Sequence, residues 1–184
     1  MKDSELMWKS GEKTELCRTP VFTVTSRHNT SPTGVSGDYI VTEAPDWVIV
    51  IPEKENTFLM VKQYRHGEEN LSIEFPGGVI DSGESPRQAA VRELREETGA
   101  IAGQLIHLGS MNPNPALFSN HFHVFLAADL EFTGKQELDH DEFVDYMEIP
   151  KNEVLKKMGS KEYPHALMCS AAALYMARKY IQKV

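Results

Sequence analysis

The chain has little cysteine and no long hydrophobic run. Its 184 residues include only two cysteines, Cys17 and Cys169, whose spacing gives neither a metal motif nor a disulfide framework. No N-terminal apolar run resembles a signal peptide, and no segment reaches the length of a transmembrane helix. We therefore expect a cytoplasmic protein that does not contact the membrane.

An excess of positive charge is also absent, because the formal net charge is −8 at pH 7. A general nucleic-acid binder, or a protein that binds anionic membranes, would favour a basic surface, so the composition argues against both classes. A small phosphorylated substrate, held by a few arginines and metal ions, remains compatible with this charge. With 41% hydrophobic and 25% charged residues, and no internal repeat, residues 1–184 are expected to form a single domain.

Short β-prone runs separated by turns lie on both sides of one central helical segment. We expect strands at residues 21–24, 39–42, 47–51, 58–63, 71–75, 104–109, 122–130 and 143–149, with a hairpin loop at 29–37. A C-terminal helix is expected over about residues 165–182, and the polar first 14 residues are expected to fray. This order of elements predicts an α+β fold.

The stretch from Gly78 to Gly99 is the most informative part of the chain. Ser85 is a candidate helix N-cap, Pro86 falls at the first helical position, and Gly99 supplies a C-terminal stop. Glycine and proline before this segment allow the backbone to approach another group closely. The local pattern therefore predicts a strand, a glycine loop and then a helix.

Three carboxylates share one face of this helix, because Glu93, Glu96 and Glu97 follow the i, i+3, i+4 spacing. Like charges at this spacing repel one another, and a hard divalent cation such as Mg²⁺ would compensate them and bridge to substrate phosphates. The alternative is a solvated acidic face with an ordinary surface ion pair between Arg92 and Glu96.

A longer pattern favours the first interpretation. It contains Gly78, Glu84, Arg92, Glu93, Leu94, Glu96, Glu97 and Gly99. Their spacing resembles the Nudix box, with Ala100 at the closing position where Ile, Leu or Val is usual. The resemblance to a Nudix hydrolase implies the Nudix α/β/α sandwich, with a mixed β-sheet and an N-terminal antiparallel β segment.

Segments outside the box resemble the subgroup that hydrolyses ADP-ribose and other nucleoside diphosphate sugars. They are residues 46–48, 61–65, 73–78 and Pro115, although the loop at 112–117 lacks the glycine often found beside this proline. The resemblance implies an N-terminal β segment over about residues 15–58 that forms a homodimer, and a catalytic core over about 59–184.

This subgroup implies hydrolysis of the pyrophosphate bond of a nucleotide sugar, such as ADP-ribose or GDP-mannose, to a nucleoside monophosphate and a sugar phosphate. Two other functions stay open. One is a pyrophosphatase for dinucleoside polyphosphates or nucleoside triphosphates. The other is a sensor that binds a nucleotide sugar without turnover, which the complete set of glutamates disfavours.

The resemblance also implies a Mg²⁺ site, with Mn²⁺ as an alternative ion. The implied ligands are Gly77, through its carbonyl, with Glu93, Glu96 and Glu97. Arg92 would orient the glutamates for catalysis, while Gly78, Glu84 and Gly99 would support the loop and the helix.

The general base is expected outside the box, in the acidic run at residues 137–143. We choose Glu142, with Asp139 and Asp141 as alternatives, because this segment resembles the one that carries the catalytic carboxylate in ADP-ribose hydrolases. A solvated acidic loop is the competing interpretation.

Substrate contacts are expected on several segments. Arg65 could bind a phosphate or the terminal ribose, or could form a strand-end ion pair. Trp47 could stack on a nucleobase, or could pack in the core. The remaining candidates are Glu74, for a sugar or base donor, and Pro115, Phe118 and Ser119 in the downstream loop.

Overall fold

The computed structural model describes residues 2–140 and 142–181, so Asp141 lies outside the described residues. The chain divides into two compact units. The first comprises Met1–Pro45 with Asn112–His121, and the second comprises Asp46–Met111 with Phe122–Val184.

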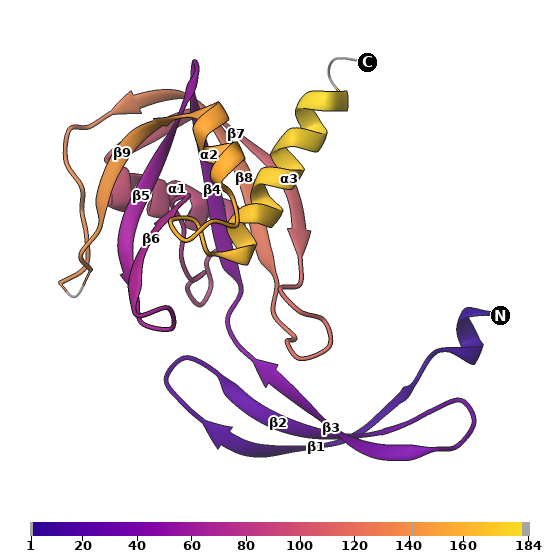
Figure 1. The fold of residues 1–184 in the computed structure, drawn as a ribbon. Coiled ribbons are helices and arrows are strands. Elements are labelled where there is room, and N and C mark those ends of the chain that lie inside the picture. Colours follow the sequence, from indigo (N-terminus) through magenta and orange to yellow (C-terminus); the bar gives the residue numbers. More distant parts are fainter. Residues whose placement is uncertain (1, 141, 182–184) are drawn as a thin grey trace. The chain divides into compact units, whose positions relative to one another are not determined.

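The first unit is built on a three-stranded antiparallel sheet (Figure 1). Its elements are a short 3₁₀ helix, η1 (Asp3–Glu5), and strands β1 (Lys9–Arg18), β2 (Thr23–Thr30) and β3 (Ser36–Glu43). The β2–β3 turn falls inside the hairpin loop expected at 29–37. The expected fraying of residues 1–14 is wrong from Lys9 onward, because β1 pairs with β2 although it is exposed along its length.

The downstream loop, Asn112–His121, belongs to this first unit. The backbone N–H of Thr42 donates to the Leu117 carbonyl at 2.7 Å, and that of Ser119 donates to the Thr42 carbonyl at 3.1 Å. The Asn120 side chain donates to the Pro45 carbonyl at 2.9 Å. The loop is therefore held at the end of β3.

The second unit contains the mixed sheet that the sequence predicts. Its strands are β4 (Trp47–Lys54), β5 (Thr57–Arg65), β6 (Asn70–Glu74), β7 (Ala100–Met111), β8 (Phe122–Phe132) and β9 (Asp145–Pro150). The strand order is β6-β5-β4-β8-β7, with β9 paired to β5. Only β4 and β8 run parallel among these pairs, and the others are antiparallel.

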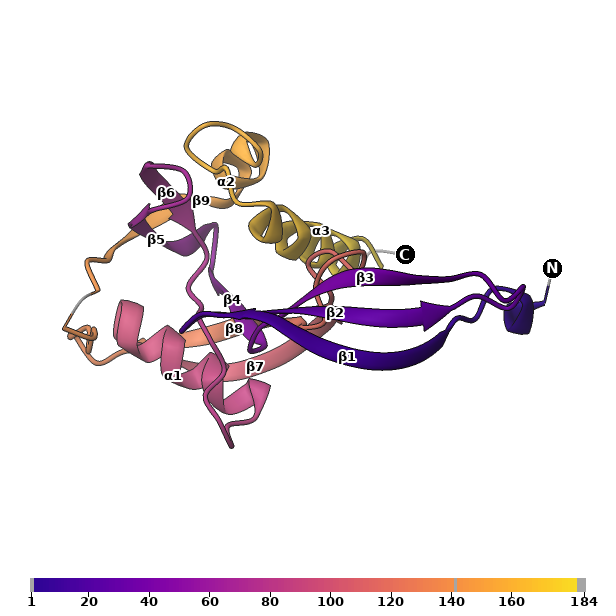
Figure 2. The same cartoon turned by 90° about the horizontal axis from the view of Figure 1, so that it is seen from below.

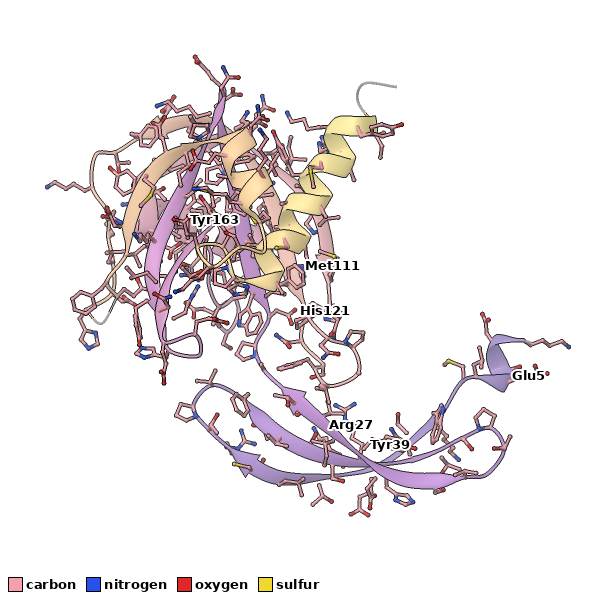
Figure 3. All side chains as sticks on the ribbon, in the orientation of Figure 1. Glu5, Arg27, Tyr39, Met111, His121 and Tyr163 are labelled. Carbon is pink, nitrogen blue, oxygen red and sulfur yellow. The ribbon has the colours of Figure 1, made fainter. Side chains whose placement is uncertain are left out.

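Three helices cover the two faces of this sheet: α1 (Pro86–Thr98), α2 (Lys151–Lys157) and α3 (Ala166–Ile181). Successive side chains of a strand point to opposite faces, so Val48 and Val50 of β4 pack in the cluster that contains α1. Ile49 and Ile51 instead join the cluster that contains α2, α3 and Tyr163, which Figure 3 labels. Figure 2 shows α1 and α3 on opposite sides of the strands, which confirms the sandwich.

The sheet opens beside β4, and this opening positions the glycine loop. β4 and β5 pair only at the end of their hairpin, at Lys54 and Thr57 and the adjacent pair. Residues 76–80 take the vacant side of β4. The backbone N–H groups of Val48 and Val50 donate to the carbonyls of Gly78 at 2.9 Å and Pro76 at 2.8 Å.

The helix α2 was not expected, because it has only seven residues and directly follows a strand that ends at Pro150. No helix in the described part of the chain is long and apolar enough to span a membrane.

We expect Leu94→Ala to lower the free energy of unfolding by about 2–5 kcal/mol, because Leu94 is 1% exposed and truncation leaves a cavity between α1 and the sheet. Val91→Ala on the same helix is the matched control, since Val91 is 48% exposed and should change stability by less than about 0.5 kcal/mol. Urea denaturation measures both, and equal effects would contradict the assigned packing of α1.

Candidate active site

Capping signals fix the rotation and the ends of α1. The Ser85 hydroxyl accepts a hydrogen bond from the Gln88 backbone N–H, and the Gln88 side chain accepts one from the Ser85 N–H at 2.9 Å. Gly99 ends the helix at φ +67°, and its N–H donates to the Arg95 carbonyl at 2.8 Å. The predicted start and end of this helix are confirmed, and the helix places its glutamates beside the glycine loop.

Arg92 connects α1 to the loop before it. Its Nε and Nη2 donate to the two Glu84 oxygens at 3.1 and 2.9 Å, in the bidentate geometry typical of arginine and a carboxylate. Its Nη1 donates to Glu93 at 2.8 Å and to Glu96 at 3.0 Å, and Nη2 also donates to the Val79 carbonyl. Interaction with Arg92 lowers the pKa of Glu84.

Glu93 and Glu97 form a buried carboxylate pair, with 8% and 3% of each residue exposed. Burial raises the pKa of Glu93 to about 7 and that of Glu97 to about 8, because desolvation disfavours the charged form. The negative charge of Glu142 acts in the same direction on both groups. One Glu97 oxygen accepts a hydrogen bond from the Gly77 backbone N–H at 2.8 Å.

The glycine loop lies so close to β4 and to Glu93 that it leaves no space for side chains at its two glycines. A side chain at Gly77 would overlap the Val48 carbonyl, and one at Gly78 would overlap the Glu93 carboxylate. Glycine is therefore required at both positions by contact rather than by local flexibility. The Gly77 carbonyl oxygen accepts no hydrogen bond from any residue that the structure describes.

Glu96 is more exposed than the buried pair and is linked to Glu93 through Arg92. Glu96 is half-buried, and Arg92 holds its carboxylate. Within residues 2–140 and 142–181, no group of three or more His, Cys, Asp or Glu side chains is already arranged to hold a metal ion. The donor chemistry nevertheless fits a hard divalent cation, because the carboxylates of Glu93 and Glu97 and the Gly77 carbonyl are oxygen ligands. A nearby positive charge would also favour the ionised forms of the two carboxylates.

The acidic loop after β8 is tied to the end of α1. Gln136, which no sequence pattern singles out, donates to the Glu97 carbonyl at 2.6 Å and to the Val144 carbonyl at 3.2 Å. Glu142 is exposed, and one of its carboxylate oxygens accepts from the Asp139 backbone N–H at 3.2 Å. The charge of Glu142 is among the main causes that raise the pKa values of Glu93 and Glu97, whereas Asp139 is not.

A cavity of about 300 Å³ adjoins the glycine loop. Its lining brings together Gly77 and Gly78 with Trp47, Arg65 and His165, and apolar side chains complete the walls. Trp47 is half-buried and also packs against the core, so packing in the core does not prevent it from lining the cavity. His165 has no motif around it, and its only sequence signal is its position just before the apolar C-terminal helix.

Arg65 forms the ion pair that the sequence offered as an alternative to substrate binding. Its Nε and Nη2 donate to both oxygens of Glu74 at 2.8 and 2.6 Å. Glu74 is completely buried, and the pair lowers its pKa despite an opposing effect of burial. Arg65 Nη1 has no hydrogen-bond partner among the described residues, and Arg65 both pairs with Glu74 and lines the cavity.

The other predicted substrate residues lie in the first unit. Pro115 and Ser119 are exposed in the loop held by β3, and Phe118 forms an isolated bridge with Thr42. Their proposed contacts with substrate stay predictions.

Comparisons with known proteins identify the family. A family model described as NUDIX domain matches residues 43–168. The ADP-ribose pyrophosphatase of Bacillus subtilis (strain 168) is 34% identical over 153 residues, covering 82% of this chain and 83% of that protein. The methanol dehydrogenase activator of Bacillus methanolicus is 36% identical over 135 residues, covering 71% of each chain.

A solved structure gives the same result for the fold. The crystal structure of an ADP compounds hydrolase superposes with a TM-score of 0.82 at 26% sequence identity, covering 97% of this chain and 96% of that chain. The family match and the pyrophosphatase relatives agree with the Nudix box and the sandwich described above. The chain belongs to the Nudix family, in its ADP-ribose pyrophosphatase subgroup, and is a hydrolase that acts on pyrophosphate bonds.

Proposed function

We propose that this chain hydrolyses the pyrophosphate bond of nucleoside diphosphate sugars, with ADP-ribose as the first candidate and GDP-mannose as an alternative. The observation that carries the proposal is the buried Glu93–Glu97 pair beside a cavity that contains Trp47 and Arg65. The names of the Bacillus subtilis relative and of the structural neighbour support an ADP-containing substrate.

Nudix hydrolases generally use divalent metal ions. For this chain we propose Mg²⁺, with Mn²⁺ as an alternative, held by Glu93 and Glu97 with Glu96 and the Gly77 carbonyl as further ligands. When bound, such an ion neutralises charge on the pyrophosphate oxygens and makes a bound water more acidic. Arg92 keeps Glu93 and Glu96 oriented, so its loss should misplace them as well as remove a charge.

The other residues position substrate and move the proton. Arg65, fixed by Glu74, presents its free Nη1 to a phosphate, and Trp47 offers an aromatic wall to the base. Glu142 accepts a proton from the attacking water while the water oxygen bonds to one phosphorus. The bond from that phosphorus to the bridging oxygen breaks, and the bridging oxygen leaves with the other phosphate. The electrostatic influence of Glu142 on Glu93 and Glu97 supports its choice over Asp139.

We also propose that the chain forms a homodimer through its first unit. Large apolar side chains are exposed on or beside its three strands. They are Leu16, Val21, Phe22, Val35, Tyr39 and Ile40. Exposed apolar side chains on a small sheet whose β1 edge pairs with no other described strand favour association with a second copy.

The function is tested by incubating the protein with Mg²⁺ and ADP-ribose, GDP-mannose, a dinucleoside polyphosphate or a nucleoside triphosphate. We expect the nucleotide sugars to give a nucleoside monophosphate and a sugar phosphate, identified by chromatography. Faster turnover of the polyphosphates would contradict the proposed substrate class. Binding of ADP-ribose without turnover would identify a sensor instead.

We expect Glu97→Gln to lower turnover more than about a hundredfold. Substitution of residues that only hydrogen-bond to a metal ligand already lowers activity or metal affinity by about tenfold to a hundredfold. Because burial disfavours the ionised form of Glu97, the neutral amide should not lower the thermal stability of the metal-free protein. Glu131→Gln, an exposed change on β8, is the control. Near-normal turnover of Glu97→Gln would remove this residue from the metal site.

Glu142→Gln should lower turnover by about a hundredfold to ten-thousandfold, the usual range for loss of a general base, while substrate affinity changes little. Asp139→Asn is the matched variant in the same loop and should retain most activity, because Asp139 is not among the main causes of the raised pKa values of the buried pair. Steady-state kinetics and ligand titration separate the two effects. The opposite ranking of the two variants would move the base to Asp139.

A further inference from the structure

His165 is held in a defined orientation by the first turn of α3. Its Nδ1 accepts a hydrogen bond from the Leu167 backbone N–H at 3.2 Å, and its carbonyl accepts one from the Met168 N–H at 3.1 Å. These bonds satisfy backbone groups that a helix N-terminus otherwise leaves unpaired. The ring position therefore follows from the position of the helix.

The same bond determines which nitrogen carries the proton. A ring nitrogen that accepts a hydrogen bond is unprotonated, so the proton of the neutral ring lies on Nε2. Burial lowers the pKa of His165, and the charge of Arg65 adds to this effect while Glu74 opposes it. His165 therefore offers one neutral donor, and Nε2 has no partner among residues 2–140 and 142–181.

His165 lines a space with the chemistry of a nucleobase site. His165 and Arg65 both line the 300 Å³ cavity, and both also line a neighbouring cavity of about 530 Å³. Trp47, Val79 and Leu167 give the smaller cavity apolar walls. Flat aromatic ligands bind in such apolar spaces and are oriented by a few polar groups.

We propose that His165 is a specificity-determining residue that binds the nucleobase of the substrate, by donating its Nε2–H to a ring nitrogen of the base. The assignment rests on the proposed function and specifies which half of the substrate the cavity takes. The charged Arg65 matches a phosphate, whereas a neutral N–H matches an uncharged acceptor. The two side chains thus divide the recognition of a nucleotide between them.

The test uses the two reaction products as probes, AMP and ribose 5-phosphate, titrated into the full chain by calorimetry with Mg²⁺ present. His165→Ala removes both the helix cap and the donor. His165→Asn keeps a capping oxygen but does not reach as far as Nε2, and His165→Gln restores an amide N–H near that position. His107→Ala, at an exposed position on β7 outside the cavity, is the control.

We expect the Ala and Asn variants to bind AMP about fivefold to tenfold more weakly, the cost of one neutral hydrogen bond, and the Gln variant to recover part of the loss. Affinity for ribose 5-phosphate should not change. In the hydrolysis of ADP-ribose, KM should rise by the same factor while kcat stays within about twofold. Thermal unfolding should show that Asn restores the stability that Ala loses.

Unchanged AMP affinity in the Ala or Asn variant would overturn the assignment, as would an equal loss of affinity for ribose 5-phosphate. Recovery of AMP binding together with stability in the Asn variant would show that His165 only caps the helix. A wild-type protein that hydrolyses ADP-ribose but binds no AMP also overturns it. A wild-type protein that binds AMP but hydrolyses no nucleotide sugar contradicts the proposed function alone, and the variants then still decide the role of His165.

Discussion

The guanidinium of Arg92 is the group on which the arrangement of the site depends. Three glutamates on one helix face repel one another, and Arg92 compensates Glu93 and Glu96 while its other nitrogens hold Glu84 of the preceding loop. It forms no hydrogen bond to Glu97, which receives only the Gly77 N–H. The carboxylates that Arg92 compensates least therefore lie on the buried side of α1, where desolvation raises their pKa values and a bound cation would favour their ionised forms.

The separation of β4 and β5 leaves space for the glycine loop beside these carboxylates. Because those strands separate after their hairpin, the segment at 76–80 hydrogen-bonds with β4 and runs under α1. The approach is so close that Gly77 and Gly78 have no space for a side chain. Gly77 lets the backbone lie against β4, and Gly78 leaves room for the Glu93 carboxylate.

The parts of the molecule that sequence reasoning found are those encoded locally. Ser85 and Gly99 mark the ends of α1 through bonds to residues within four positions, so their meaning is visible in the sequence. By contrast, β1 has no buried position and depends on pairing with β2, and the tether made by Gln136 depends on how the chain returns to α1. Sequence reasoning also missed His165, because the residues that line the cavity with it are distant in the sequence.

The carboxylates proposed to bind metal and the side chains proposed to recognise the substrate lie on different elements. The carboxylates belong to α1, whereas Arg65 and His165 lie at the end of β5 and the start of α3. Glu74 is completely buried and binds Arg65 with both oxygens, so Glu74 orients Arg65, whose charge also acts to lower the pKa of Glu97. Substitution at Arg65 or His165 would reshape the cavity while Arg92 still holds its glutamates.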